Sequence, residues 1–146
     1  MRIQVGDRVS HAGVEFQVRS IARYLLPKGE FRLCELVGPD ETVFLVPPST
    51  PAHNRVVWFR SIPPLDIATP PPKTIAWRNE SYLLAQSGPV TVTMDPPTGQ
   101  ADSTFDIFRY RAAGDAFLHI ESATASPRML AGHSVSTDLI EIRPAS

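Results

Sequence analysis

The four histidines of this chain, His11, His53, His119 and His133, are its first candidates for catalysis or metal binding. None lies in an HExxH sequence or at another recognised ligand spacing. His119 and Glu121 stand two positions apart, so on a β-strand they would share a face and offer two metal ligands. Because no third ligand follows at a set spacing, we interpret this pair as part of a solvated polar face.

His119-Ile120-Glu121 also matches the H-x-E of zinc deaminases, whose chemistry requires a Pro-Cys-x-x-Cys segment as well. Cys34 is the only cysteine, which excludes that chemistry, an internal disulfide and a multi-cysteine metal site. An activated thiol needs a nearby base and some exposure. Cys34 lies within the apolar run 31–37, and we therefore interpret it as a small core residue.

Motifs that bind phosphate or build a nucleophile are missing from the sequence. Neither G-x-x-x-x-G-K nor G-x-G-x-x-G occurs, and there is no Gly-x-Ser-x-Gly elbow. The sequence therefore designates no catalytic residue, no metal ligand and no cofactor, and it leaves the binding residues unknown. A hydrolytic enzyme whose carboxylates meet from distant loops stays open as an alternative.

Four aromatic residues could form a binding face: Trp58, Phe59, Trp77 and Tyr82. Aromatic side chains in strands pack in cores more often than they form platforms, so we interpret all four as core. Two arginine pairs, Arg19 with Arg23 and Arg109 with Arg111, each share an outward strand face. Such pairs suit anion or RNA contacts, although most exposed arginines are partnered by acids such as Asp115.

Charge and composition bound the class of protein. The formal net charge is −1, from 14 basic and 15 acidic residues, so no overall positive field collects phosphate backbones. With 42% hydrophobic and 20% charged residues, the chain has the composition of a folded globular protein. There is no apolar leader and no run of the length that a membrane span needs, and we expect a cytoplasmic protein.

The first elements that must position these residues are a hairpin and a meander. Residues 14–26 alternate, with every even position except Ser20 apolar, and a two-residue turn at Ala12-Gly13 places Val9 opposite Phe16. Further strands are expected at 31–37, 42–46 and 55–62. The runs 31–37 and 43–46 carry apolar residues on both faces, which predicts central strands covered on two sides.

The pattern of the second half of the chain also predicts strands. Residues 75–77 and 81–85 flank Arg78-Asn79-Glu80, which predicts strand, turn and strand, with a short helix over 75–86 as the alternative. Residues 90–94 alternate and form a strand of their own. In a hairpin over 105–121, a loop at 112–114 would place Arg111 opposite Asp115. Its inward face then holds Phe108, Tyr110, Ala116 and Leu118, and its outward face holds Ile107, Arg109, Phe117 and His119.

Residues 63–73 contain five prolines and form the one plausible boundary. They divide the chain into a first β half at 1–62, a Pro-rich linker at 63–73 and a second β half at 74–146, with one continuous domain as the alternative. No sequence repeat is clear, although each side has room for about five strands. We predict an all-β protein of about ten strands, arranged as a meandering barrel or as two small SH3-like barrels packed together.

Several stretches, taken in order, are similar to a known bacterial family. They are V-G-D-R-V at 5–9, V-E-F-Q-V at 14–18, S-Y-L-L-A-Q-S-G-P-V-T-V at 81–92, F-L-H-I-E at 117–121 and G-H-S-V-S-T-D-L-I-E-I at 132–142. Together they resemble the family of domain of unknown function 4178, with its starting Gly-Asp and its late Leu-x-Ile-Glu. The resemblance covers nearly the whole chain and supports the fold. It implies no catalytic residue, because no activity is established for that family.

The function predicted from the sequence is therefore a non-catalytic, intracellular bacterial β module that docks onto a protein partner or into a larger assembly. A nucleic-acid-binding barrel is the runner-up, and the hydrolytic enzyme is the third alternative. Neither the partner nor the oligomeric state follows from the sequence.

Overall fold

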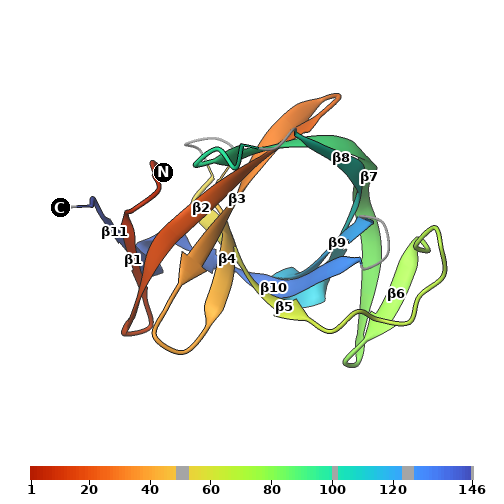
Figure 1. Ribbon diagram of the computed structural model, residues 1–146. Helices are drawn as coiled ribbons and strands as arrows, with labels where there is room; N and C mark the ends of the chain where they lie inside the picture. Colours follow the sequence, from red (N-terminus) through yellow and green to blue (C-terminus); the bar gives the residue numbers. More distant parts are fainter. Residues whose placement is uncertain (49–52, 100–101, 123–126, 146) are drawn as a thin grey trace.

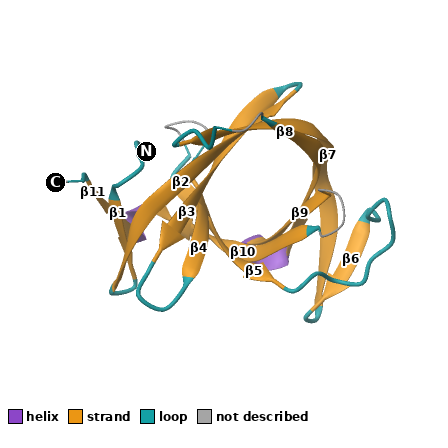
Figure 2. Ribbon diagram, viewed as in Figure 1, coloured by secondary structure: helices purple, strands orange, loops and turns teal. Residues whose placement is uncertain are grey.

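The computed structural model of the chain describes residues 1–48, 53–99, 102–122 and 127–145 (Figures 1 and 2). Within these residues there are eleven β-strands and two short 3-10 turns, with no α-helix. None of the described segments forms a helix that could cross a membrane. The strands are β1 (Arg8–His11), β2 (Val14–Leu26), β3 (Gly29–Val37), β4 (Thr42–Val46), β5 (Arg55–Ile62), β6 (Thr74–Trp77), β7 (Glu80–Asp95), β8 (Ser103–Ala112), β9 (Ala116–Ser122), β10 (Arg128–Ser136) and β11 (Ile140–Arg143).

All eleven strands belong to one antiparallel sheet, in the order β11-β1-β2-β3-β4-β5-β10-β9-β8-β7-β6. An additional pairing of β2 with β7 closes eight of them into a barrel, which Figure 1 shows end on. Closure leaves the eight barrel strands without a continuous free edge. The other strands, β1, β6 and β11, lie outside the ring. The prediction of an all-β barrel is confirmed.

Each side of the Pro-rich segment contributes four strands to the barrel. The strands β2 to β5 precede residues 63–73 and β7 to β10 follow them, and the pairs β2–β7 and β5–β10 join the two sets. A third pairing, β1 with β11, also connects the two sides. The strands thus form one closed barrel, and not the two small packed barrels that the sequence allowed as an alternative.

The barrel interior is a hydrophobic core that receives side chains from all eight strands. Its buried members are Ala22, Tyr24, Phe31, Leu33, Phe44, Val46, Phe59, Val90, Val92, Ile107 and Leu130, with Phe117 packed against them from β9. Removal of this apolar surface from water stabilises the ring, because burial of each large side chain contributes about 1.5–3 kcal/mol.

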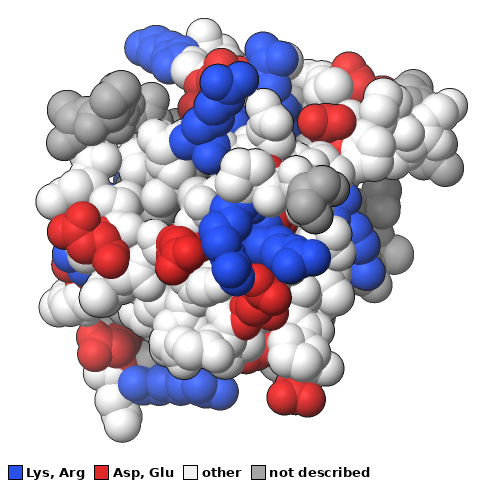
Figure 3. Space-filling view, turned by 90° about the vertical axis from the view of Figure 1, so that its left-hand side faces the viewer, with Lys and Arg blue, Asp and Glu red and all other residues white. Residues whose placement is uncertain are grey.

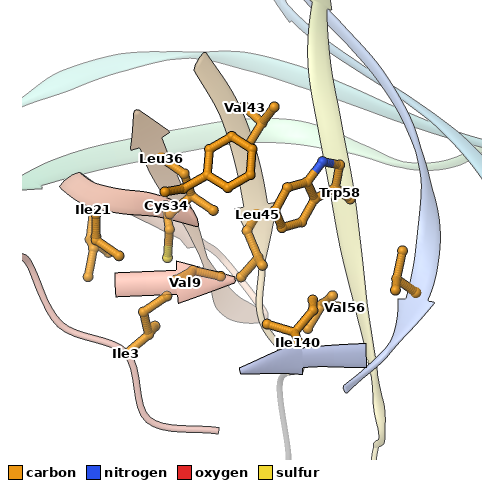
Figure 4. Close-up of a cluster of buried hydrophobic side chains, with 13 residues drawn as sticks. Ile3, Val9, Ile21, Cys34, Leu36, Val43, Leu45, Val56, Trp58 and Ile140 are labelled. Atoms are coloured by element: carbon orange, nitrogen blue, oxygen red, sulfur yellow. The ribbon is translucent and has the colours of Figure 1, made fainter. Parts of the chain in front are cut away.

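Two further cores cover the outer faces of the barrel. The first packs β1, β11 and Ile3 against β2 to β5, and it contains Cys34 and Trp58 (Figure 4). The second packs β6 and residues of the Pro-rich segment, Leu65 and Ile67, against β7 to β10. The strands at 31–37 and 42–46 are therefore covered on both faces, as predicted.

The aromatic residues and the cysteine occupy the positions that the sequence predicted for core residues. Trp58, Phe59 and Tyr82 are buried, and Trp77 packs against the second outer core. Cys34 is fully buried, and burial raises the pKa of its thiol to about 12, so the thiol is not activated.

A β-bulge redirects the long strand β2. The pairing with β3 shifts between Val18 and Ser20, so Arg19 is the extra residue. Before the bulge, Phe16 and Val18 point into the first outer core, whereas Ala22 and Tyr24 after it point into the barrel. The even positions are largely buried, as their alternation predicted, but they serve two cores on opposite faces of the sheet.

The two sides of the barrel have equivalent construction. A short strand, a turn with two residues of positive φ, a long bulged strand and three further strands occur first in β1 to β5 and again in β6 to β10. The pair Val9–Phe16 brackets the first turn as Ile75–Tyr82 brackets the second. The bulged residues, Arg19 in β2 and Ala85 in β7, follow their turns by the same number of positions.

The strand β7 corrects two expectations. Residues 75–77 and 80–95 form a strand, a turn and a strand, so the alternative helix over 75–86 is wrong. The separate strand expected at 90–94 is the last part of β7, which continues through Gly88 and Pro89. The pairing of β7 with β6 ends at Leu83, and its pairing with β2 begins only at Thr91. Between these residues one edge of β7 is unpaired, so the missing N–H of Pro89 leaves no ladder hydrogen bond unmade on that edge.

The hairpin of β8 and β9 has the expected strands with a different register. Its loop is Ala113-Gly114-Asp115, one residue later than predicted, and Ala112 pairs with Ala116. Both Gly114 and Asp115 adopt positive φ, which places the reversal around them. Arg109 consequently lies opposite His119, where the sequence placed Phe117.

Candidate functional site

Four polar side chains meet inside one end of the barrel and form a cluster around the Glu121 carboxylate. Arg128 donates from Nε to Oε1 at 3.1 Å and from Nη2 to Oε2 at 2.9 Å. The Tyr24 hydroxyl donates to Oε2, and His119 Nε2 lies 2.8 Å from the same oxygen. Arg128 Nη2 also donates to the Tyr24 oxygen at 2.9 Å. We call Tyr24, His119, Glu121 and Arg128 the Glu121 cluster.

Pairing between adjacent strands brings the cluster together. Glu121, next to the last residue of β9, lies directly opposite Arg128, which begins β10. His119 stands two residues before Glu121 on the same face of β9, while Tyr24 reaches the cluster from β2. The pair of Glu121 and Arg128 is bidentate, the geometry in which a guanidinium binds a carboxylate most strongly.

The environment fixes the charges of the cluster. Burial alone would raise the pKa of Glu121, but the hydrogen bonds from His119 and Arg128 and the charge of Arg128 lower it to about 2. Burial lowers the pKa of His119 and outweighs the hydrogen bond to Glu121 and the charge of that carboxylate, which raise it, so the imidazole is neutral near pH 7. Its tautomer with the proton on Nε2 donates to Glu121. Burial raises the pKa of Tyr24.

The interpretation of His119 and Glu121 as a solvated polar face is wrong. His119 is 1% exposed and Glu121 is 6% exposed. The face that the sequence placed outward on β8 and β9 points into the barrel, where Ile107 is fully buried. The opposite face, with Tyr110 and Leu118, is also buried, under β6 and the Pro-rich segment.

A pocket of about 400 Å³ opens beside the Glu121 cluster at this end of the barrel. We call this opening the Glu121 mouth. Its polar wall includes Glu121, Arg128, Glu35 and Asp102, and its apolar wall includes Leu33, Phe44, Val92, Met94 and Phe105. Glu35 accepts from Arg19 Nε at 2.7 Å and from the Ser20 hydroxyl at 3.3 Å. The hydrogen bond from Arg19 lowers the pKa of Glu35.

A second pocket, of about 350 Å³, opens at the opposite end of the barrel, where Arg109 lines it. We call this end the Arg109 mouth. The inward-facing residues of one strand line first one mouth and then the other. In β2, Ala22 and Tyr24 line the Glu121 mouth, and Leu26 lines the Arg109 mouth. Between the mouths, Tyr24 stacks on Phe31 with ring centroids 4.6 Å apart, and His119 meets both rings edge-on.

The remaining histidines lie apart from the Glu121 cluster. His11 packs against Trp58 with ring centroids 4.9 Å apart, and its Nδ1 lies 3.2 Å from the Leu139 carbonyl oxygen. His53 is exposed at the Arg109 mouth, and His133 is exposed at a third pocket. Among the described residues, no three His, Cys, Asp or Glu side chains converge as a metal site would require.

Three of the four arginines that the sequence paired on outward faces have acidic partners. Arg19 binds Glu35 at 2.7 Å, Arg23 binds Glu30 at 2.6 Å and Arg111 binds Asp115 at 3.0 Å. Arg109 differs, because it turns into the barrel. On the side of the molecule that carries β1 and β11, basic and acidic side chains are interspersed (Figure 3).

Sequence reasoning found His119 and Glu121 but not Tyr24 or Arg128 as members of one site. Tyr24 is 97 positions from Glu121, and no spacing links such distant residues. A signal for burial was nevertheless present, because the strand face that carries His119 also carries the apolar Phe117. A face with large apolar residues beside polar ones indicates a barrel interior as readily as a surface.

These features define an eight-stranded antiparallel barrel with a polar pocket at each mouth. The model of the family described as domain of unknown function (DUF4178) matches residues 4–137. The chain belongs to that family, as its resemblance predicted. Neither the curated proteins nor the solved structures searched gave a match.

Proposed function

We propose that the chain is a non-catalytic barrel module of the bacterial cytoplasm, and that it docks a protein partner at the Glu121 mouth. The observation that carries this proposal is the state of the two glutamates there. Glu35 and Glu121 are each bound by an arginine, and the pKa of each is lowered. A general acid that works near neutrality needs a raised pKa instead.

The Glu121 mouth has features that suit recognition. Its polar groups are held in fixed positions by the strands and by each other, which reduces the entropy lost on binding. The apolar wall, which includes Phe44 and Met94, offers surface to bury beside them. A volume of about 400 Å³ accommodates one or two side chains of a partner segment.

Two observations support the choice of a protein partner in a reducing compartment. Arg19, Arg23 and Arg111 already have acidic partners, so they are not free to follow a phosphate backbone. The single cysteine is buried and takes no part in a disulfide.

Affinity purification from the native cell tests the proposal. Ser103→Trp places a bulky side chain at an exposed position that lines the Glu121 mouth. Ser81→Trp makes the same change at an exposed position of β7 outside that pocket and serves as the control. We expect one set of proteins to co-purify with the wild type and with Ser81→Trp, and to be lost with Ser103→Trp.

Two results would count against the proposal. Nucleic acid that co-purifies and is released by salt would favour the nucleic-acid alternative. Saturable turnover of a metabolite, abolished by Glu35→Gln, would favour the hydrolytic one. Circular dichroism of each variant establishes that the barrel is intact.

A further inference from the structure

We infer that the Arg109 mouth binds a phosphate monoester, with the phosphate held by Arg109 and the organic part against the apolar wall of the barrel. The inference concerns the end of the barrel opposite the proposed docking pocket and rests on different residues.

The comparison of the two halves shows what is missing around Arg109. Glu35 lies opposite Ser20 in the pairing of β2 with β3, and Arg109 lies opposite Gln86 in the pairing of β7 with β8. Each of these pairs directly follows the bulge of its long strand. Glu35 and Arg109 are thus equivalent charged residues at the two mouths.

The counter-charge is present in only one half. The bulged residue beside Ser20 is Arg19, which neutralises Glu35 at 2.7 Å. The bulged residue beside Gln86 is Ala85, which has no charge to offer. Arg109 Nη1 donates to Gln86 Oε1 at 3.1 Å, and this amide is the one hydrogen-bond partner of the guanidinium among the described residues.

Arg109 is also withdrawn from water without an acid beside it. Its guanidinium lies over the Phe31 ring, 4.2 Å from the centroid, and burial lowers its pKa. Every Asp and Glu of the chain lies in its described part, and none forms an ion pair with Arg109 there. A partly buried cation without a counter-charge is costly, and an anionic ligand removes that cost.

Other groups at the same pocket favour a doubly charged oxyanion. Lys28 and Arg55 line it, and neither has an acidic partner among the described ion pairs. Arg55 is held by Ser134, through Nε to the hydroxyl at 2.9 Å and Nη2 to the carbonyl at 3.1 Å. Glu30, the one acid at the pocket, is already bound by Arg23 at 2.6 Å.

The apolar wall explains why an organic phosphate suits the Arg109 mouth. Val46 and Val57, a cross-strand pair, occupy the places that Glu121 and Arg128 take at the other mouth. With Leu26 and Phe31 they leave an apolar surface below the cationic groups, in a pocket of about 350 Å³. A ligand with an anionic head and an apolar body matches both parts.

Isothermal titration calorimetry with phenyl phosphate tests the inference, with inorganic phosphate and benzoate as comparison ligands at one ionic strength. We expect phenyl phosphate to bind at least tenfold more tightly than either of them. Affinity for benzoate equal to that for phenyl phosphate would overturn the choice of phosphate over carboxylate. Equal affinity for inorganic phosphate would overturn the role of the apolar wall.

Two variants locate the binding. Arg109→Gln removes the charge, and Ala85→Glu supplies at an exposed bulge the counter-charge that the other half has. Both should weaken phenyl phosphate at least tenfold, whereas Arg111→Gln, two positions along and exposed, should not. Ala85→Glu keeps Arg109, so it still tests whether the phosphate binds at this mouth if Arg109→Gln does not fold. Unchanged affinity in Ala85→Glu, or no binding by the wild type, would overturn the proposal.

Discussion

His119 Nε2 lies 2.8 Å from Glu121 Oε2 in the barrel interior, so a neutral imidazole donates to a buried carboxylate that Arg128 neutralises. Both oxygens of the carboxylate accept hydrogen bonds, and no buried side-chain polar atom among the described residues lacks a partner. Satisfied polar groups of this kind fix the geometry of an interior, whereas a partly satisfied group destabilises it.

Removal of the Glu121 charge should destabilise the barrel strongly. Glu121→Ala leaves Arg128, Tyr24 and His119 without their common acceptor, and loss of one partner of a buried pair costs about 3–5 kcal/mol. Urea denaturation measures the free energy of unfolding. Glu41→Ala, which breaks the exposed pair with Arg60, is the matched control and should cost less than about 1 kcal/mol. Similar losses in both variants would contradict the role given to the Glu121 cluster.

The stability of the protein should fall as the pH drops below neutrality. The folded-state pKa of His119 lies below its ordinary 6.5, so its contribution is complete above that pH and is lost as the pH falls below it. Glu121 adds a loss below its ordinary 4.5, towards its folded pKa of about 2. In His119→Gln, the free energy of unfolding should depend less on pH between 7.5 and 5. His133→Gln, at an exposed position, should keep the wild-type slope; a wild-type slope in His119→Gln would refute the assignment.

Gly132→Ala should weaken the joint between β5 and β10. A Cβ at Gly132 would stand 1.9 Å from the carbonyl oxygen of Trp58, a contact that only movement of the backbone relieves. Because the pairing of β5 with β10 is one of the two joints between the halves of the barrel, we expect a loss of at least ~2 kcal/mol. Thermal and urea unfolding measure it, with Ser134→Ala in the same strand as the milder control. Wild-type stability of Gly132→Ala would contradict the close approach.

Fragments 1–62 and 74–146 should not fold separately. Each would lose the partners of its outer barrel strands and leave long unpaired edges, at β2 and β5 or at β7 and β10. Circular dichroism and denaturation of each fragment test this, and mixing them should restore the cooperative transition. As the control, a full chain cut by a protease at a site engineered into 63–73 should stay assembled. Cooperative unfolding of either fragment alone would show two independent domains.

Local patterns predicted the strands and the first hairpin. The apolar alternation of residues 14–26 and the two-residue turn at Ala12-Gly13 predicted the Val9–Phe16 pairing, which is confirmed. The register of 105–121 was wrong because Asp115 also adopts positive φ, a conformation that a sequence pattern does not reveal. The faces of β8 and β9 were misassigned because alternation separates two faces but does not tell a surface from a barrel interior.

The site depended on contacts that the sequence does not encode locally. Tyr24 and Arg128 meet because β2 and β10 belong to the same closed ring, although they are 104 positions apart. The equivalence of the halves was hidden for a related reason. Equivalent interior positions hold different residues: Phe44 lies opposite Glu35 in the first half, and His119 lies opposite Arg109 in the second. The two halves therefore share their strand pairing but not their residues.

The stacked rings of Tyr24 and Phe31, with His119 against them, fill the middle of the barrel. These rings separate the pocket at the Glu121 mouth from the pocket at the Arg109 mouth. We therefore expect a substitution at one mouth to leave the pocket at the other mouth unchanged. A single ring of strands thereby forms two separate pockets, one at each end, with the same buried rings between them.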